Sequence, residues 1–268
     1  MKYIFIIIVT ALFLYRENSI LSVSRYTIKS PKLKKKTVIA QISDFHNTYK
    51  KTLRQKLWKQ IREEDPDFIC ITGDLIDSRR TNIRIAVDFV HQLAQIAPVY
   101  YVTGNHEIRS KRYREIMDAF GRTPMTIIED EAYIIDDINL IGLNDFYKVP
   151  LSQREELFTS IYQSLKKENM FNMVMFHRPE LFNAYCDNEA DLVICGHCHG
   201  GQFRIPFIGP SYAPNQGWLP KLAEGLHQQK NTSLIVSRGI GNSLFPFRVN
   251  NHPELVIITL QPENDVEL

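Results

Sequence analysis

The chain has 268 residues, of which 32 are Lys or Arg and 30 are Asp or Glu, so its formal net charge is +2. Hydrophobic residues make up 44% and aromatic residues 11% of the sequence, values that exclude a disordered, collagenous or low-complexity chain. This length provides enough core for one large domain or two small ones without disulfides.

The N-terminal part of the chain combines an apolar run with a basic segment. The run Tyr3–Tyr15 is interrupted only by Thr10. As a helix it would be roughly 20 Å long, shorter than the roughly 30 Å hydrocarbon core of a bilayer. It fits a signal-peptide core, a short uncleaved anchor or a buried helix. We therefore divide the chain into a hydrophobic anchor or signal-like segment, residues 1–22, and one domain, residues 23–268.

The distribution of charge bears on partners and location. Residues 1–36 contain eight basic residues and one acidic residue, so we expect this segment to contact a membrane surface. The remaining residues are acidic overall, which argues against specific nucleic-acid binding. Basic residues after the apolar run favour a domain on the cytoplasmic face, whereas a short basic N-terminus favours the opposite side. Four cysteines without disulfide-like spacing agree with the cytoplasmic face, and nothing indicates the oligomeric state.

From Thr37 onward short apolar runs alternate with helical patterns, which predicts a layered α/β fold. Two helices are predicted from apolar residues on one face, the first from Leu53, Leu57 and Ile61 and the second from Ile83, Val87, Val90 and Ala94. Residues 202–231 are the least regular part, because four prolines exclude long helices and central strands. We expect this region to be an elaborated loop beside the ligand site.

Five apolar runs with the character of strands end in Asp, Asn or His: Val38–Ile42, Phe68–Ile71, Val99–Val102, Phe171–Phe176 and Leu192–Cys195. In open α/β sheets, ligands bind at the carboxyl ends of the strands. The polar residues at these ends are seven candidate metal ligands, namely Asp44, His46, Asp74, Asn105, His177, His197 and His199.

Seven mixed nitrogen and oxygen ligands exceed the four of a structural zinc site. They suit two adjacent divalent ions that share a carboxylate, the arrangement that stabilises the attacking and leaving oxygens in phosphoester hydrolysis. Because hard oxygens are mixed with imidazoles, Mn²⁺ is favoured, with Fe and Zn as alternatives. In extended backbone, Asp44 and His46 would project to one side, as would His197 and His199, while Phe45 and Cys198 face away.

The polar ends form ordered blocks: Asp44-Phe45-His46, Gly73-Asp74, Gly104-Asn105-His106-Glu107, His177 and Gly196-His197-Cys198-His199. They resemble the blocks of the calcineurin-like metallophosphoesterase superfamily. The resemblance implies a four-layer αββα sandwich of two mixed β-sheets flanked by helices. It also implies that Asp74 bridges two metals, that Asp44, His46 and His199 complete one site, and that Asn105, His177 and His197 complete the other.

The resemblance also implies catalytic roles for His106 and Asn105. His106 would contact the phosphoryl group, protonating the leaving oxygen or stabilising charge, while Asn105 binds metal. Asp77 and Asp145 are candidates either for orienting metal-bound groups or for turns and caps. Arg238 is a candidate for a substrate phosphate or an ordinary surface residue. Cys195 and Cys198 are best interpreted as small buried thiols.

The chain departs from the protein-phosphatase branch, because Gly73–Arg79 and Thr103–Glu107 lack the Arg-Gly pairs of that branch. The apolar N-terminus, Gly200-Gly201-Gln202 and the run Ser237–Gly241 resemble the bacterial membrane-associated branch, which contains phosphodiesterases and lipid-precursor pyrophosphohydrolases.

We therefore expect a phosphodiesterase or pyrophosphohydrolase that acts on an amphiphilic or envelope-related phosphorylated substrate. The loop 202–231 would contact acyl chains or form a small core of its own, through Phe203, Ile205, Phe207, Ile208 and Trp218. The alternatives are a phosphomonoesterase of the same fold or a non-catalytic binding scaffold. A scaffold would be expected to lack ligands, and none is missing here.

Overall fold

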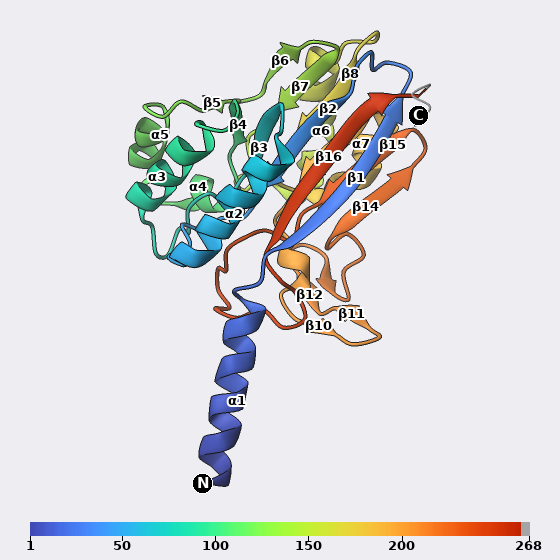
Figure 1. Cartoon of the computed structure of the whole chain (residues 1–268). Helices are drawn as coiled ribbons and strands as arrows, with labels where there is room; N and C mark the ends of the chain where they lie inside the picture. Colours follow the sequence, from blue (N-terminus) through green and yellow to red (C-terminus); the bar gives the residue numbers. More distant parts are fainter. Residues whose placement is uncertain (264–268) are drawn as a thin grey trace, which may run out of the picture.

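The first helix, α1 (Lys2–Glu17), projects from a body in which two β-sheets pack face to face (Figure 1). The computed structural model describes residues 1–263. Within these residues, no helix combines the length and the apolar character that crossing a bilayer requires.

The first sheet has six strands in the order β1-β16-β2-β3-β4-β5. Strand β16 runs parallel to β1 and antiparallel to β2, and the strands from β2 to β5 are parallel, so the sheet is mixed. The strands are β1 (Ser22–Ser30), β2 (Thr37–Ile42), β3 (Phe68–Thr72), β4 (Val99–Val102), β5 (Thr126–Ile127) and β16 (Glu254–Pro262).

The second sheet also has six strands, in the order β14-β15-β9-β8-β7-β6. Its four central strands are parallel, and an antiparallel strand closes each edge. The strands are β6 (Glu131–Ile135), β7 (Ile138–Gly142), β8 (Phe171–Met175), β9 (Leu192–Cys195), β14 (Gly225–Gln229) and β15 (Thr232–Val236).

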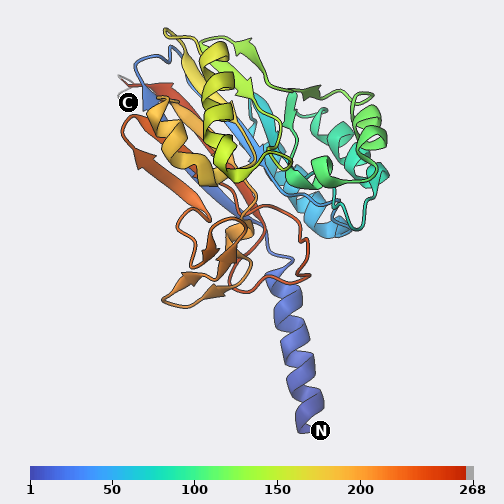
Figure 2. The same cartoon turned by 180° about the vertical axis from the view of Figure 1, so that it is seen from behind.

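Helices cover the outer face of each sheet (Figures 1 and 2). The first sheet carries α2 (Lys51–Glu64), α3 (Ile83–Leu93) and α5 (Tyr113–Phe120), and the second carries α6 (Arg154–Leu165) and α7 (Phe182–Asp187). Three separate buried clusters fill the three spaces between layers: one under each set of helices and one between the sheets. This arrangement confirms the predicted four-layer sandwich.

The buried face that was predicted for α2 is correct, whereas α3 is rotated relative to its predicted buried face. Leu53, Leu57 and Ile61 are buried, as predicted. On α3 the buried residues are Ala86, Phe89, Val90 and Leu93, whereas three of the four predicted residues are only partly buried. The large Phe89 ring stacks on Phe45 with a centroid distance of 3.9 Å, and packing this ring turns the helix away from the predicted face.

The predicted basic arm is divided between two ends of the molecule. Strand β1 leads away from α1 and pairs with β16 over nine residues, so it separates the two ends by roughly 30 Å (Figure 1). Beyond it, Lys32 pairs with Asp191 at 2.8 Å and Lys35 with Asp136 at 2.6 Å. Residues 22–36 therefore belong to the body, and the expectation that residues 1–36 contact a membrane stays a prediction.

The remaining elements are short and lie in loops. They are α4 (Asn105–Arg109), the 3-10 turns Leu151–Gln153, Pro179–Leu181 and His199–Gly201, and four two-residue strands, β10 (Arg204–Ile205), β11 (Gly209–Pro210), β12 (Tyr212–Ala213) and β13 (Gly217–Trp218). Both views place these small strands at the end of the body from which α1 projects (Figures 1 and 2). Of residues 202–231, which were predicted to be an elaborated loop, residues 202–219 are irregular, whereas Gly225–Gln229 form the edge strand β14.

Candidate metal centre

The candidate ligands meet where the carboxyl ends of strands from both sheets converge. Asp44 and His46 follow β2, Asp74 follows β3, and Asn105 is the first residue of α4 after β4; His177 follows β8, and His197 and His199 follow β9. Six of the seven are buried, and the His199 side chain is 12% exposed. The structure brings together every ligand that was predicted from the sequence.

The first group consists of Asp44, His46 and His199. The Nε2 atoms of His46 and His199 face each other at 3.1 Å, and Oδ1 of Asp44 lies 3.3 Å from Nε2 of His199. Three potential donor atoms thus surround one point, in the combination that the resemblance assigned to one metal.

The second group consists of Asp74, His177 and His197. Oδ2 of Asp74 lies 3.4 Å from Nε2 of His177, which lies 3.2 Å from Nδ1 of His197. The same Asp74 oxygen is 3.7 Å from Nε2 of His46 in the first group. Asp74 therefore lies between the two groups, where a shared carboxylate is required.

Unpartnered atoms and ring orientation both fit a pair of divalent ions. Oδ1 of Asp44 and Oδ1 of Asn105 are buried without a hydrogen-bond partner among residues 1–263, a situation that costs about 1–3 kcal/mol per group. Nδ1 of His46 lies 3.2 Å from the Ile76 carbonyl oxygen and Nδ1 of His177 lies 2.8 Å from that of Thr72. Because a carbonyl only accepts, these Nδ1 atoms carry hydrogens and leave Nε2 free to bind metal.

The electrostatics of the group favour cation binding. Burial and the neighbouring His106 lower the pKa of His46 to about 3, and burial lowers those of His197 and His199 well below their usual value. These rings are therefore neutral, the form that coordinates metals. Burial alone would lower the pKa of His177, but Asp74 and Asp44 raise it to about 10. Without metal, His177 thus carries a proton that an ion would replace.

The backbone of the ligand loops differs from the extended form that was predicted. Asp44, His46, His197 and His199 have φ values of 50°, 47°, 72° and 48°, in the left-handed region that non-glycine residues rarely adopt. The prediction of extended backbone was therefore wrong. The intervening side chains do face away, since Phe45 and Cys198 are buried in the cores under the helices of the first and second sheets.

Glu107 holds two ligand loops together, a role that the sequence analysis did not assign. Its carboxylate accepts hydrogen bonds from the backbone N–H groups of Asp74 at 3.0 Å, Ile76 at 3.0 Å and Gly104 at 2.8 Å. It is fully buried, and burial together with Asp74 raises its pKa to about 8. The spacing of three residues from Gly104 is that of a helix capping box, a signal that was available in the sequence.

Gly104 itself makes a close approach that only glycine permits. A Cβ atom at this position would overlap the carboxylate of Asp74. The absence of a side chain therefore lets the turn before α4 pack directly against the shared ligand.

His106 lies beside His46 of the first ligand group and the shared Asp74. Its Nδ1 accepts the backbone N–H of Ser78 at 3.0 Å. Nε2 lies 3.1 Å from Oγ of Ser243 and in contact with the Arg109 guanidinium. Asp77 lies 3.4 Å from Nδ1 of His106 and accepts the N–H of Arg79 within its own turn, which fits the turn role predicted for it.

The family assignment follows from the sequence profile of calcineurin-like phosphoesterases, which matches residues 37–201 and thus contains all seven candidate ligands. The chain belongs to this family. It is therefore a metallophosphoesterase, a hydrolase of phosphate esters, and its ligand groups indicate a binuclear site for divalent ions.

Three relatives show the range of this phosphoesterase family. The chain is 28% identical over 265 residues to the uncharacterised metallophosphoesterase YkuE of Bacillus subtilis, covering 93% of this chain and 89% of YkuE. It is 26% identical to the phosphodiesterase YaeI of Escherichia coli, covering 74% of this chain and 72% of YaeI. It is 27% identical to the UDP-2,3-diacylglucosamine pyrophosphatase LpxG of Chlamydia muridarum, covering 47% of this chain and 39% of LpxG.

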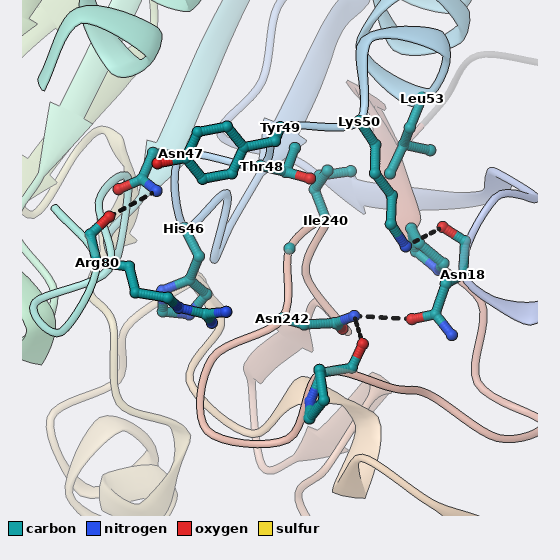
Figure 3. Close-up of a pocket in the computed structure, with 13 residues that line it drawn as sticks. Asn18, His46, Asn47, Thr48, Tyr49, Lys50, Leu53, Arg80, Ile240 and Asn242 are labelled. Atoms are coloured by element: carbon teal, nitrogen blue, oxygen red, sulfur yellow. Dashed lines mark hydrogen bonds between the residues drawn. The ribbon is translucent and has the colours of Figure 1, made fainter. Parts of the chain in front are cut away.

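In this phosphoesterase the ligands form the floor of a cleft of about 660 Å³. Asp74, Asn105, His106, His197 and His199 line its inner part, and the outer part is lined by apolar side chains, namely Phe203, Tyr212, Trp218, Leu244 and Phe245. A second, smaller cavity of about 160 Å³ lies on another side of His46, next to Asn18, Asn47 and Asn242 (Figure 3). Because most ligands open into the larger cleft, that cleft is the candidate substrate site.

Arginines at the cleft differ in how their charge is balanced. Arg178 pairs with Asp145 at 2.8 Å and with Glu180 at 3.1 Å, and Arg154 lies 3.6 Å from Glu180. Asp145 therefore holds Arg178, the residue that follows His177. The sequence did not reveal this pairing.

Arg79 and Arg109 instead contact Ser243 and Ser78, and neither forms an ion pair within residues 1–263. Arg238, the predicted phosphate ligand, is paired with Glu254 at 3.0 Å and does not line the cleft.

Proposed function

We propose that this phosphoesterase hydrolyses a phosphodiester or diphosphate bond of an amphiphilic substrate with two divalent ions bound, Mn²⁺ being favoured. The observation that carries the proposal is the pair of ligand groups that share Asp74 at the floor of the cleft. Asp44, His46 and His199 would hold one ion, and Asn105, His177 and His197 the other. When bound, the ions would activate water and stabilise charge on the phosphoryl group.

The side chains around the ions have separate tasks in this proposal. Glu107 holds the turns that carry Asp74 and Asn105 at a fixed separation. Nε2 of His106 faces Ser243 and Arg109 in the cleft, where the protonated ring would donate to the leaving oxygen. General acid assistance of this kind typically contributes about 10²–10⁴-fold to the rate.

The charge beside His106 favours a substrate whose leaving group is itself anionic. Arg79 and Arg109 line the cleft on this side without a carboxylate partner within the described chain. A diphosphate, or a diester of a charged alcohol, would place negative charge there, whereas a simple monoester would not. The names of YaeI, a phosphodiesterase, and LpxG, a pyrophosphatase of a diacylated nucleotide sugar, support the same choice.

The apolar outer wall of the cleft supports an amphiphilic substrate. Phe203, Trp218 and Phe245 would contact acyl chains while the phosphate lies over the ligands. We also propose that α1 attaches the protein to a membrane, with the domain on the cytoplasmic face. Exposed apolar side chains along α1 support attachment to the membrane. The basic residues that follow α1 in the sequence support a domain on the cytoplasmic face.

Metal removal tests the central part of this proposal. Chelation should abolish hydrolysis, and added Mn²⁺ should restore it, because the two ions would supply both the activated water and the charge stabilisation. The restored enzyme should then be assayed on a phosphomonoester, a phosphodiester and a lipid-linked diphosphate. Full activity in rigorously metal-free protein would contradict the metal requirement. Preference for the monoester would contradict the proposed substrate class.

A further inference from the structure

Helix α1 exposes apolar side chains around its whole circumference. Seven consecutive residues, Tyr3 to Val9, are exposed, with Tyr3 at 81% and Ile6 at 50%. Successive helical residues point about 100° apart, so these side chains cover every direction. A groove on a partner protein would bury one face only, whereas lipid would surround the helix. At about 1.5 Å per residue, α1 is roughly 24 Å long.

The end of α1 is attached firmly to the segment 242–252. The Glu17 carboxylate accepts the N–H of Asn250 at 2.6 Å and contacts Nε2 of His252 at 3.0 Å. The Asn18 side chain accepts from the Asn242 amide at 2.7 Å, and Lys50 donates to the Asn18 carbonyl at 3.0 Å (Figure 3). These contacts fix the direction of α1 relative to the loop that borders the cleft.

Six exposed apolar side chains form what we term the apolar rim: Ile205, Phe207, Ile208, Trp218, Leu244 and Phe245. Phe207 is fully exposed and Trp218 is 79% exposed. Figures 1 and 2, which view the molecule from opposite sides, both place residues 204–218 at the end from which α1 projects. The segment that carries four of the rim residues therefore lies at the end of the body from which α1 projects.

Half of the rim also borders the cleft, whereas Ile205, Phe207 and Ile208 line a separate hollow. Trp218, Leu244 and Phe245 line the cleft and are at the same time exposed. The Gln202 amide donates to the carbonyl of Phe245 at 3.1 Å, and the rings of Phe203 and Phe245 meet at 5.6 Å. The two loops of the rim are thus held together at the opening.

We propose that α1 and the apolar rim dock together on a lipid bilayer, so that the mouth of the cleft opens onto the lipid surface. The occupant is lipid because α1 is apolar on all sides and the rim carries no charged side chain. Substrate then enters from the bilayer, with its acyl chains leaving past Trp218 and Phe245. This inference deepens the proposed function, but its test does not depend on catalysis.

Trp218 provides a direct probe, since the chain has only one other tryptophan, Trp58. In a Trp58→Phe variant of the full chain, Trp218 fluorescence should be quenched by phosphatidylcholine vesicles that contain brominated acyl chains. Vesicle binding without quenching would show that α1 binds alone with the rim in water, and would overturn the proposal. So would α1-dependent dimers without vesicle binding, because a second copy would then cover the helix.

Rim substitutions test the contribution of the loops. Phe207→Ser with Ile208→Ser should lower partitioning into vesicles by about tenfold or more, because two large apolar side chains no longer enter lipid. The control is Ile134→Ser on β6, a 50% exposed apolar residue outside the rim, which should leave partitioning unchanged. Equal partitioning of both variants would contradict the rim. Neither variant changes a residue that lines the cleft, so both should keep their activity on a soluble ester. Loss of that activity would bear on the proposed function and not on the rim.

Discussion

The metal centre and the apolar rim lie at the two ends of one cleft and are built in opposite ways. The candidate ligands are buried, and backbone contacts such as those of Glu107 fix their loops. The rim side chains are exposed and stand on two-residue strands and loops. The comparison indicates that the reaction depends on short segments at strand ends, whereas access and substrate choice depend on the outer loops. Changes to each region should therefore have separable effects.

The largest effect is expected at the shared ligand. Asp74→Asn should reduce turnover by more than about 10³-fold and lower the metal content, because both ligand groups use this carboxylate. Metal analysis and the rate on a soluble ester measure the two effects. Asp88→Asn, a change of the same kind on the exposed side of α3, should alter neither. Two ions and a normal rate in Asp74→Asn would contradict the role of this residue.

A smaller loss should separate acid catalysis from metal binding. His106→Ala should keep both ions and reduce turnover by about 10²-fold, since a proton donor beside the leaving group is lost. Asn105→Ala should instead lower the occupancy of one site, because its unpartnered oxygen is the candidate ligand. The reverse pattern, with metal lost in His106→Ala and kept in Asn105→Ala, would exchange the two assignments.

Arg79 should affect only substrates with a charged leaving group. Arg79→Gln should reduce kcat/KM about tenfold for a diphosphate and leave a phosphomonoester nearly unchanged, because a hydrogen bond to a charged group is worth about 1.5–3 kcal/mol. Arg84→Gln, at an exposed position on α3, is the matched control. Equal losses on both substrates would show that Arg79 supports His106 or the fold instead of selecting the leaving group.

The smallest effect on the reaction is expected from removing most of α1. Deletion of residues 2–13 keeps Glu17 and Asn18, whose contacts hold Asn250 and Asn242. Deletion to residue 22 would remove these contacts and confuse attachment with stability. The shorter deletion should leave the rate on a soluble ester within about twofold and abolish hydrolysis of substrate in vesicles. Unchanged activity on vesicles would show that α1 does not attach the enzyme.

The sequence predicted those features that depend on local patterns. Each candidate ligand follows an apolar run, so the position of His177 or Asp74 could be found without knowing the packing. The same runs predicted β2, β3 and β4 of the first sheet and β8 and β9 of the second. The left-handed backbone at Asp44 and His199 left no such signal, because neither is a glycine.

Features that depend on distant segments were missed. Residues 22–30 form β1, but the charges around them suggested an arm, and the pairing partner β16 lies at the other end of the chain. Arg248 is fully buried. Its guanidinium donates hydrogen bonds to the carbonyl oxygens of Arg238 and Gly241, and its backbone N–H donates to the Asn18 side chain. Burial of an arginine in this way depends on three segments that come together only in the folded protein.

The position of β16 sets an order for the synthesis of this protein. Strand β1 joins the first sheet only through β16, which lies between β1 and β2 and is made after the other strands of both sheets. During elongation β1 has no partner, while α1 has already emerged and is free to reach lipid. Only when residues 250–262 arrive do they close the sheet and bind Glu17 and Asn18. With the membrane attachment proposed above, the newly made chain would reach lipid before its catalytic body is complete.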